Sequence, residues 1–181
     1  MNHIGTQRIK TNRLTLRKIT LADTSDFFVL CSKPSVSRYV TWYTHENIET
    51  TKVVVQSWVN SYNDDRYLWA IEYNSRVIGN IDVISLDDGV AHMGWMIDEP
   101  YWNQGIMTEA TVAVRDYLFE KVGIRKMESM HIIENIGSGR VMQKIGMTFR
   151  ENRIFDNADK PKFLGKELAY YALTREEWET I

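Results

Sequence analysis

The segment WNQGIMTEA, residues 102–110, places a polar, glycine-containing turn directly before a helix-period pattern that begins near Thr108. The first N–H groups of a helix have no partners within the helix, and the helix dipole adds partial positive charge there. Such a turn can hold a pyrophosphate through backbone donors alone, and Gly105 lets a ligand approach the main chain. An ordinary capped turn is the alternative, because Gly and Asn punctuate turns in many proteins.

The segment ENIGSGRVMQKIGM, residues 134–147, opens a second helix after the next strand-like run. Ser138 shares one helical face with Val141, Met142 and Ile145, so its hydroxyl points to the same side as the apolar residues. Such a hydroxyl is often a helix cap or a satisfied core group. Because this strand–helix unit adjoins the first segment, Ser138 is also a candidate to contact the same ligand.

His92 is the candidate general base. It alternates with Ala91 and Met93 in a strand-like run, so it faces the opposite side of the sheet from them. An imidazole, with a reference pKa of about 6.5, suits proton removal near neutral pH. A hydrogen-bonded or exposed strand histidine is the alternative. Glu109, in a first helical turn, indicates a structural role, and Glu134 is typical of a solvated strand end.

Cys31 is the only cysteine, which excludes an internal disulfide and a cysteine-based zinc cluster. It follows Phe28 and Leu30 on an expected helix and has no basic neighbour to activate it. This environment favours a small hydrophobic packing role over a nucleophile. No His-Glu-x-x-His or similar spacing indicates a metal site.

Length and charge limit the remaining classes. The chain has 181 residues and a net charge of −2, with basic residues scattered along it. We expect a single domain, residues 1–181, and no nucleic-acid or membrane partner, since either would favour a basic patch. The N-terminus has no apolar run, which favours a cytoplasmic protein.

The first half of the chain predicts a strand, two helices and a three-stranded meander. Residues 13–19 alternate as a strand, and Thr20 with Asp23 caps a helix that Pro34 breaks. A second helix starts near residues 46–47 and buries one face. Strands at 67–73, 76–85 and 90–98, separated by short turns, form an antiparallel meander.

The second half predicts a parallel crossover followed by a helix and two strands. A helix that Gly123 ends leads to a strand at 126–133, which makes a βαβ unit with the strand at 90–98. A short helix at 137–146 and strands at 148–155 and 162–174 complete the order β-α-α-β-β-β-α-β-α-β-β. The fold class is α/β with a mixed, mostly antiparallel sheet.

Four segments together resemble the GCN5-related N-acetyltransferase (GNAT) superfamily, especially its ribosomal-protein N-alpha-acetyltransferase branch. They are TNRLTLR (11–17), HMGWMIDEPYWNQGIMTEA (92–110), ENIGSGRVMQKIGM (134–147) and YYALTREEW (170–178). The resemblance runs from Arg8 to Trp178, nearly the whole chain. It implies a GNAT fold with a splayed central sheet.

The resemblance implies acetyl-CoA as cosubstrate and assigns residues to it. Main-chain groups of the loop would hold the pyrophosphate; these residues are Trp102, Asn103, Gln104, Gly105, Ile106, Met107 and Thr108. The pantetheine arm would lie between the splayed strands AHMGWMI and MESMHII. A bulge in the first of them would aim the backbone N–H of Met96 or Ile97 at the thioester carbonyl. Asn135 would steady the pantetheine, and Ser138 would lie near the sulfur.

Three positions depart from the family pattern. The phosphate signature prefers Gln or Arg where this chain has Trp102, and Gly or Ala where it has Met107. Many relatives carry Glu where this chain has His92. Backbone donors do not depend on these side chains, but a bulky Met107 beside the phosphates could alter affinity for the cosubstrate.

The implied reaction is direct attack of a neutral amine on the acetyl thioester. We expect the acceptor to approach beside the first two helices, where Tyr39, Trp42 and Tyr43 either line the site or pack as ordinary loop aromatics. A protein N-terminal alpha-amine is the leading acceptor. A small-molecule amine (polyamine, antibiotic or peptide toxin) and a non-catalytic CoA-binding module are the alternatives. Strand edges near the C-terminus could support a homodimer.

Overall fold

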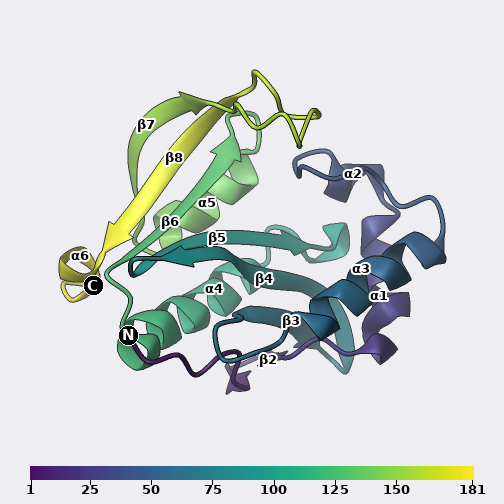
Figure 1. Ribbon diagram of the computed structural model, residues 1–181, viewed down its shortest axis with the longest axis horizontal. Coiled ribbons are helices and arrows are strands. Elements are labelled where there is room, and N and C mark those ends of the chain that lie inside the picture. The colour runs from purple at the N-terminus through teal and green to yellow at the C-terminus, as the bar shows by residue number, and fades with distance from the viewer.

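A computed structural model describes residues 1–181, and its eight strands form one sheet in the order β1-β2-β3-β4-β5-β6-β8-β7 (Figure 1). The strands are β1 (Ile9–Lys10), β2 (Thr15–Arg17), β3 (Leu68–Tyr73), β4 (Arg76–Asp87), β5 (Val90–Ile97), β6 (Lys126–Ile132), β7 (Thr148–Ile154) and β8 (Glu167–Thr174). Only β5 and β6 pair in parallel; every other neighbouring pair is antiparallel. The predicted mixed sheet, meander and parallel crossover are confirmed.

The helices cover both faces of this sheet (Figure 1). They are α1 (Thr24–Cys31), α2 (Pro34–Ser37), α3 (Ile48–Asn60), α4 (Ile106–Tyr117), α5 (Ile136–Lys144) and α6 (Arg175–Trp178), with short turns η1 (Leu21–Asp23), η2 (Glu99–Tyr101) and η3 (Leu118–Val122). None of these helices has the length and apolar character needed to cross a bilayer.

An apolar core lies between the sheet and the helices on each of its two faces. The larger core packs α4 and α5 against the sheet and includes Ala91 and Met93 of β5. The smaller core packs α1 and α3 against the other face and includes Met96 of the same strand. Because side chains alternate along a strand, His92 and Met96 share the α1–α3 face. The predicted orientation of His92, away from Ala91 and Met93, is therefore confirmed.

Local signals explain most helix boundaries. The Asp23 carboxylate accepts a hydrogen bond from the backbone N–H of Thr20 at 2.7 Å, and Asn47 caps α3 by accepting from Thr50 N–H at 3.0 Å. Gly123, in the left-handed conformation at φ 82°, ends the helical segment that starts with α4. The roles of Thr20 with Asp23 and of Gly123 were predicted; for α3 the sequence predicted only a start near residues 46–47.

Several boundaries differ from the sequence prediction. Pro34 begins the short helix α2 instead of only ending its predecessor, since proline is favourable in a first helical turn. Helix α4 begins at Ile106, earlier than predicted, because Gly105 takes a left-handed φ of 72° and caps it. The predicted strand at 162–174 is too long: residues 162–166 form a turn with Gly165 at φ 76°, and β8 starts at Glu167. Strand β1 and helix α6 were not predicted.

Candidate active site

The loop before α4 presents a run of free backbone donors. None of the N–H groups of Asn103–Thr108 has an acceptor within the protein, and helical bonding begins with Glu109 N–H donating to Gly105 C=O at 2.9 Å. Asn103 and Gly105 both take left-handed conformations, with φ of 59° and 72°. Unpaired donors at a helix N-terminus form an anion-binding site. The geometry therefore fits the predicted seat for a pyrophosphate.

Two side chains of this loop stabilise its conformation by hydrogen bonds. Trp102 Nε1 donates to Ile97 C=O at 2.9 Å, and Gln104 Nε2 donates to Pro100 C=O at 2.6 Å. Trp102 thereby ties the loop to the end of β5, and Gln104 ties it to η2. This explains how Trp102 can replace the family's Gln or Arg: its indole N–H is used to hold the loop, and the ligand-facing donors remain those of the main chain.

Met107 does not obstruct the loop. Its side chain is only 6% exposed and packs in the larger core, with α4 and the sheet. The expectation that a bulky residue here lies beside the phosphates is therefore wrong, because the first turn of α4 directs this side chain inward. Thr108 is half-buried, and its hydroxyl makes no hydrogen bond within the protein.

Arg13 is a charged neighbour of this loop that the sequence analysis missed. Its Nη1 donates to Gln104 C=O at 3.1 Å, and its Nε donates to Glu109 at 2.6 Å. Glu109 also accepts from the Thr11 hydroxyl at 2.6 Å. Burial raises the pKa of Glu109, but the hydrogen bonds from Thr11 and Arg13 outweigh it and hold the pKa below its usual value. Glu109 therefore anchors the N-terminal segment to α4, in the structural role expected of it.

The central strands diverge as the sequence predicted. β5 and β6 pair from Val90 with Lys126 to Met93 with Ser129, where the Ser129 hydroxyl donates to Met93 C=O at 2.9 Å. Beyond this point both strands continue without pairing to each other, and Figure 1 shows them spreading apart. The opening exposes backbone groups that a parallel ladder would otherwise satisfy.

The predicted bulge in β5 is wrong. β5 pairs regularly with β4 from Met93 to Ile97, and the register shift lies on β4, at Ile84. Gly94 makes this possible: a Cβ there would come within 2.8 Å of Ile84 Cδ1. The extra residue of β4 therefore occupies space that a side chain on β5 would need.

Strand alternation decides which N–H groups of β5 face the opening. Asp98 N–H donates to Ile78 C=O of β4 at 2.8 Å, whereas Met93 C=O faces β6. Backbone groups alternate in direction along an extended strand. The N–H of Met96 therefore belongs to the ladder with β4, which corrects its assignment to the thioester carbonyl. The N–H groups of Ile97, as predicted, and of Trp95, which was missed, face the opening.

Asn135 and Ser138 lie at the start of α5, on the β6 side of the opening. Asn135 is the N-cap of this helix, and its Oδ1 accepts from Ser138 N–H at 3.2 Å. The Asn135 side-chain amide N–H₂ and the half-buried Ser138 hydroxyl make no hydrogen bonds within the protein. Both are available donors beside the opening, which fits the roles predicted for them. Glu134 is exposed and unpaired, as a solvated strand end should be.

His92 lies on the last paired stretch of β5, close to the point of divergence. Its Nδ1 is 3.6 Å from Glu128 Oε1 on β6, and its side chain is 21% exposed. Burial lowers the pKa of His92, and the nearby Glu128 carboxylate offsets part of this effect. The imidazole is therefore mostly neutral at neutral pH, the state in which it can accept a proton.

The three loop aromatics differ in accessibility. Tyr39 packs beside Ile132, Phe163 and Leu168, and Trp42 packs against the smaller core. Only Tyr43, 65% exposed, presents its ring to solvent. The packing alternative therefore accounts for Tyr39 and Trp42, and a role for all three residues in acceptor binding stays a prediction.

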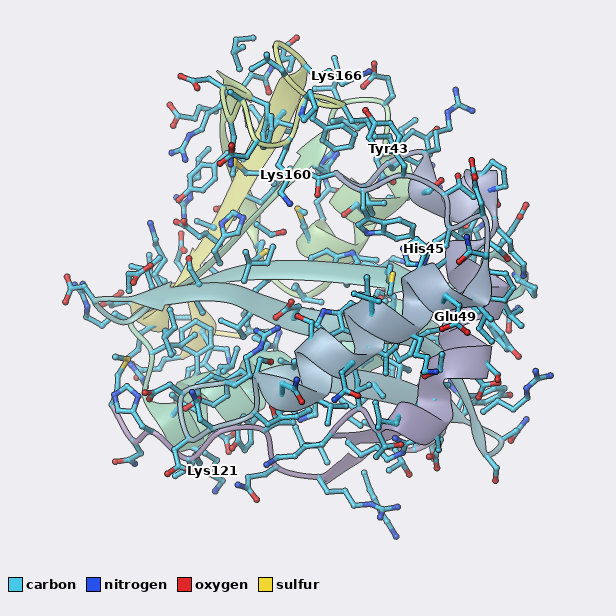
Figure 2. The ribbon with its side chains drawn as sticks, turned by 45° about the vertical axis from the view of Figure 1, so that its right-hand side comes forward. Tyr43, His45, Glu49, Lys121, Lys160 and Lys166 are labelled. Atoms are coloured by element: carbon cyan, nitrogen blue, oxygen red, sulfur yellow. The ribbon has the colours of Figure 1, made fainter.

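Lys162 joins this loop to the β7–β8 connection. Its Nζ donates to Ser37 C=O at 2.5 Å and to Trp42 C=O at 2.8 Å. Lys162 Nζ also lies 5.5 Å from the centre of the Tyr43 ring, and Figure 2 shows Tyr43, Lys160 and Lys166 toward the same end of the molecule. The two connections thus meet on the α1–α3 side of the molecule, where the acceptor was expected.

Cys31 does not have the properties of a nucleophile. The side chain is buried, and burial, with the nearby Asp98 charge, raises the pKa of its thiol to about 12. The thiolate is the reactive form of cysteine, so this residue is inert near neutral pH.

Known proteins are similar to this chain in sequence and in fold. Residues 13–148 match the acetyltransferase (GNAT) domain family. The chain is 29% identical over 143 residues to the Uncharacterized N-acetyltransferase YoaA of Bacillus subtilis, which covers 76% of this chain and 81% of YoaA. A GNAT-family acetyltransferase from Bacillus anthracis superimposes with a TM-score of 0.81 at 23% identity, covering 94% of this chain and 99% of that one. RimL, described as a ribosomal L7/L12 alpha-N-protein acetyltransferase, superimposes with a TM-score of 0.77 at 18% identity, covering 93% and 94% of the two chains.

The two superpositions establish the fold, and the family match spans most of the chain. The resemblance predicts that acetyl-CoA binds at the free N–H groups before α4 and between the diverging strands. The chain belongs to the GNAT family and is an N-acetyltransferase that uses acetyl-CoA to acetylate an amine.

Proposed function

We propose that the acceptor is the alpha-amine of a peptide or protein N-terminus. The observation that carries this proposal is the pairing of carboxylates on the sheet face that holds His92. Asp82 is bonded to Arg66, Asp98 to Lys33, and Glu128 to Lys126. A polyamine or aminoglycoside carries several positive charges and needs free carboxylates for binding. An N-terminus carries one amine and needs no such cluster.

The basicity of the acceptor supports the same choice. An alpha-amine has a reference pKa of about 7.7–8.0, whereas an alkylamine resembles lysine at about 10.4. His92 has a lowered pKa and is a weak base. Near pH 8 at least about half of such an amine is already neutral, so a weak base suffices to take the proton that the amine loses on attack.

Each group of the site then has one task. Acetyl-CoA supplies the acetyl thioester. The N–H groups of Asn103–Thr108 hold its pyrophosphate, and Ile97 or Trp95 N–H faces the developing negative charge on the carbonyl oxygen. The Ser138 hydroxyl donates a hydrogen bond or proton toward the sulfur, directly or through water. His92 accepts the proton that the amine loses.

The test is a release assay for free thiol with matched acceptors. Peptides with a free N-terminus are compared with the same peptides blocked at that terminus, and with polyamines and aminoglycosides. We expect acetyl-CoA-dependent thiol release with the free peptides and none with the blocked ones. If blocking the terminus leaves the rate unchanged, or if only polycations react, the acceptor is a different amine.

The structure bears differently on the two alternative functions that the sequence left open. A small-molecule amine is the remaining competitor, and the polycation arm of the assay addresses it. A non-catalytic CoA-binding module loses one of its two sequence arguments, because Met107 is buried away from the loop. A cytoplasmic location and a homodimer stay predictions; β7 is the edge strand at which pairing between copies would occur.

A further inference from the structure

A hydrogen-bonded cluster lies beside His92 and involves residues that the reaction described above does not use. Tyr170 Oη donates to Glu128 Oε2 at 2.6 Å, and Lys126 Nζ lies 2.8 Å from the same oxygen. Lys126 Nζ also donates to Tyr170 Oη at 3.1 Å. The guanidinium of Arg153 lies 3.6 Å from the centre of the Tyr170 ring. Two donors therefore hold Oε2 of Glu128, and Oε1 is left facing His92.

The sheet register fixes this arrangement. His92 and Glu128 are direct partners in the parallel β5–β6 pair, one position before pairing ends. Tyr170 of β8 pairs with Met130 of β6, so it lies on the same face as Glu128. The cluster thus sits across three strands, next to the place where β5 and β6 diverge.

We propose that Glu128, held by Lys126 and Tyr170, is a positioning residue that keeps the His92 proton on Nδ1 and leaves Nε2 free to accept the proton of the attacking amine. The inference rests on the proposed role of His92 as the base. Glu128 Oε1 lies 3.6 Å from His92 Nδ1, slightly beyond hydrogen-bond distance. A carboxylate this close favours the tautomer that carries its proton on Nδ1, and it orients the ring. When Nε2 takes the amine proton, the imidazolium that forms lies beside the Glu128 anion, and the proton then passes to water.

Glu128 is less suited to be the base itself. Burial raises its pKa, but the hydrogen bonds from Lys126 and Tyr170 outweigh burial and hold the pKa below its usual value. The carboxylate is therefore a poor proton acceptor. Its other oxygen, Oε1, lies 3.6 Å from His92 Nδ1.

Other charged groups also lie around His92. Lys126 of β6 and Arg153 of β7 are positive and oppose an imidazolium, although each is partnered by a carboxylate. On β4, Asp82 pairs with Gly94 of β5 and so shares the His92 face, where Arg66 neutralises it. Glu128 is the anion in direct reach of the imidazole.

The substitution Glu128→Gln makes a sharp test. Lys126 can only donate, so it retains the amide oxygen, and the amide N–H₂ group then faces Nδ1 of His92. Nδ1 must become the acceptor, and the tautomer reverses. Histidine ¹⁵N NMR of the protein reports the tautomer directly. The variant His92→Gln assigns the His92 signal, and His45, in the loop before α3, serves as an internal reference. We expect the Nδ1–H form in the parent protein and the Nε2–H form in the variant.

Kinetics then show whether the tautomer matters. With whichever amine the enzyme acetylates, Glu128→Gln should lower kcat by roughly 10²-fold, the lower end for general base catalysis, with KM for acetyl-CoA unchanged. The acid limb of the kcat profile should move to lower pH, since the variant no longer stabilises the imidazolium. Tyr170→Phe, which removes one donor to Glu128, should give a smaller loss. Glu179→Gln removes an exposed carboxylate paired with Arg175 and serves as the control.

The outcomes separate this inference from the proposed acceptor. An unchanged tautomer in Glu128→Gln, or a loss of rate without movement of the acid limb, overturns the positioning role even if N-terminal peptides are acetylated. Tautomer reversal with a lower kcat supports the role even if the acceptor proves to be a small amine. Thermal unfolding of each variant confirms that the readouts come from folded protein.

Discussion

At the scale of single residues, the backbone conformation at position 105 requires glycine, whereas the space around it would admit a larger side chain. A Cβ at this position would meet only Arg13 Nη2, at 3.7 Å, but the residue holds φ at 72°. Left-handed backbone costs a non-glycine residue about 1–2 kcal/mol, and Asn tolerates it better than most. We therefore expect Gly105→Val to weaken CoA binding by at least about tenfold, since about 1.4 kcal/mol corresponds to that factor. Gly105→Asn should bind nearly normally, as Asn103 already adopts this conformation. Titration calorimetry with CoA distinguishes them; equal affinity for both variants would contradict the role of the loop.

Ser138 offers a second test at this scale, because its hydroxyl has no partner in the protein. Ser138→Ala should change the free energy of unfolding by no more than about 0.5 kcal/mol, as at an ordinary surface position. It should nevertheless reduce kcat by roughly 10²-fold if the hydroxyl helps the departing thiolate. Thiol release and urea unfolding measure the two effects. Ser57→Ala, on the exposed side of α3, is the matched control. A normal kcat in Ser138→Ala would remove this residue from the reaction.

At the scale of elements, Lys162 holds two connections together over the acceptor side. Its ammonium is the donor to both Ser37 C=O and Trp42 C=O. Hydrogen bonds from a charged donor contribute about 1.5–3 kcal/mol, so Lys162→Met should speed amide exchange in residues 38–44 by at least about tenfold. KM for the acceptor should rise more than KM for acetyl-CoA, because the cosubstrate is predicted to bind away from these two loops. Lys160→Met, an exposed neighbour visible in Figure 2, is the control. Unchanged exchange in Lys162→Met would show that the loops hold their positions without it.

The elements also show where sequence reasoning succeeds and where it stops. Alternation in β3–β6 and the apolar face of α4 are local patterns, and both predicted the structure correctly. The candidate anion-binding loop before α4 could be predicted for the same reason, since Gly105 and the start of the helix are adjacent in sequence. The shift at Ile84 could not, because it depends on which residues of β4 and β5 oppose each other. The same is true of Arg13 and Glu128, whose partners lie on distant segments.

At the scale of the whole molecule, three histidines couple folding to pH. His45 is 8% exposed and bonded to the Thr51 hydroxyl, and Nε2 of His131 is buried without a partner. Burial lowers the pKa of His45, His92 and His131 below the ordinary value. The folded state therefore binds fewer protons than the unfolded state, in which histidine has a pKa of about 6.5. Stability contributed by these groups is complete above that value and is lost as the pH falls below it.

We accordingly expect the free energy of unfolding to be nearly constant from about pH 7 to 8 and to decrease as the pH falls from about 6.5 toward 5. Carboxylates with lowered pKa, such as Asp23 and Glu109, lose their contribution only at lower pH, below about 4, so the two windows are separable. Urea unfolding across this range measures the slope. His131→Gln removes one of the three titrating groups and should flatten it between about pH 6.5 and 5. Stability that is flat or rises on acidification through this range would show that the buried imidazoles take up protons as readily in the folded chain as in the unfolded one.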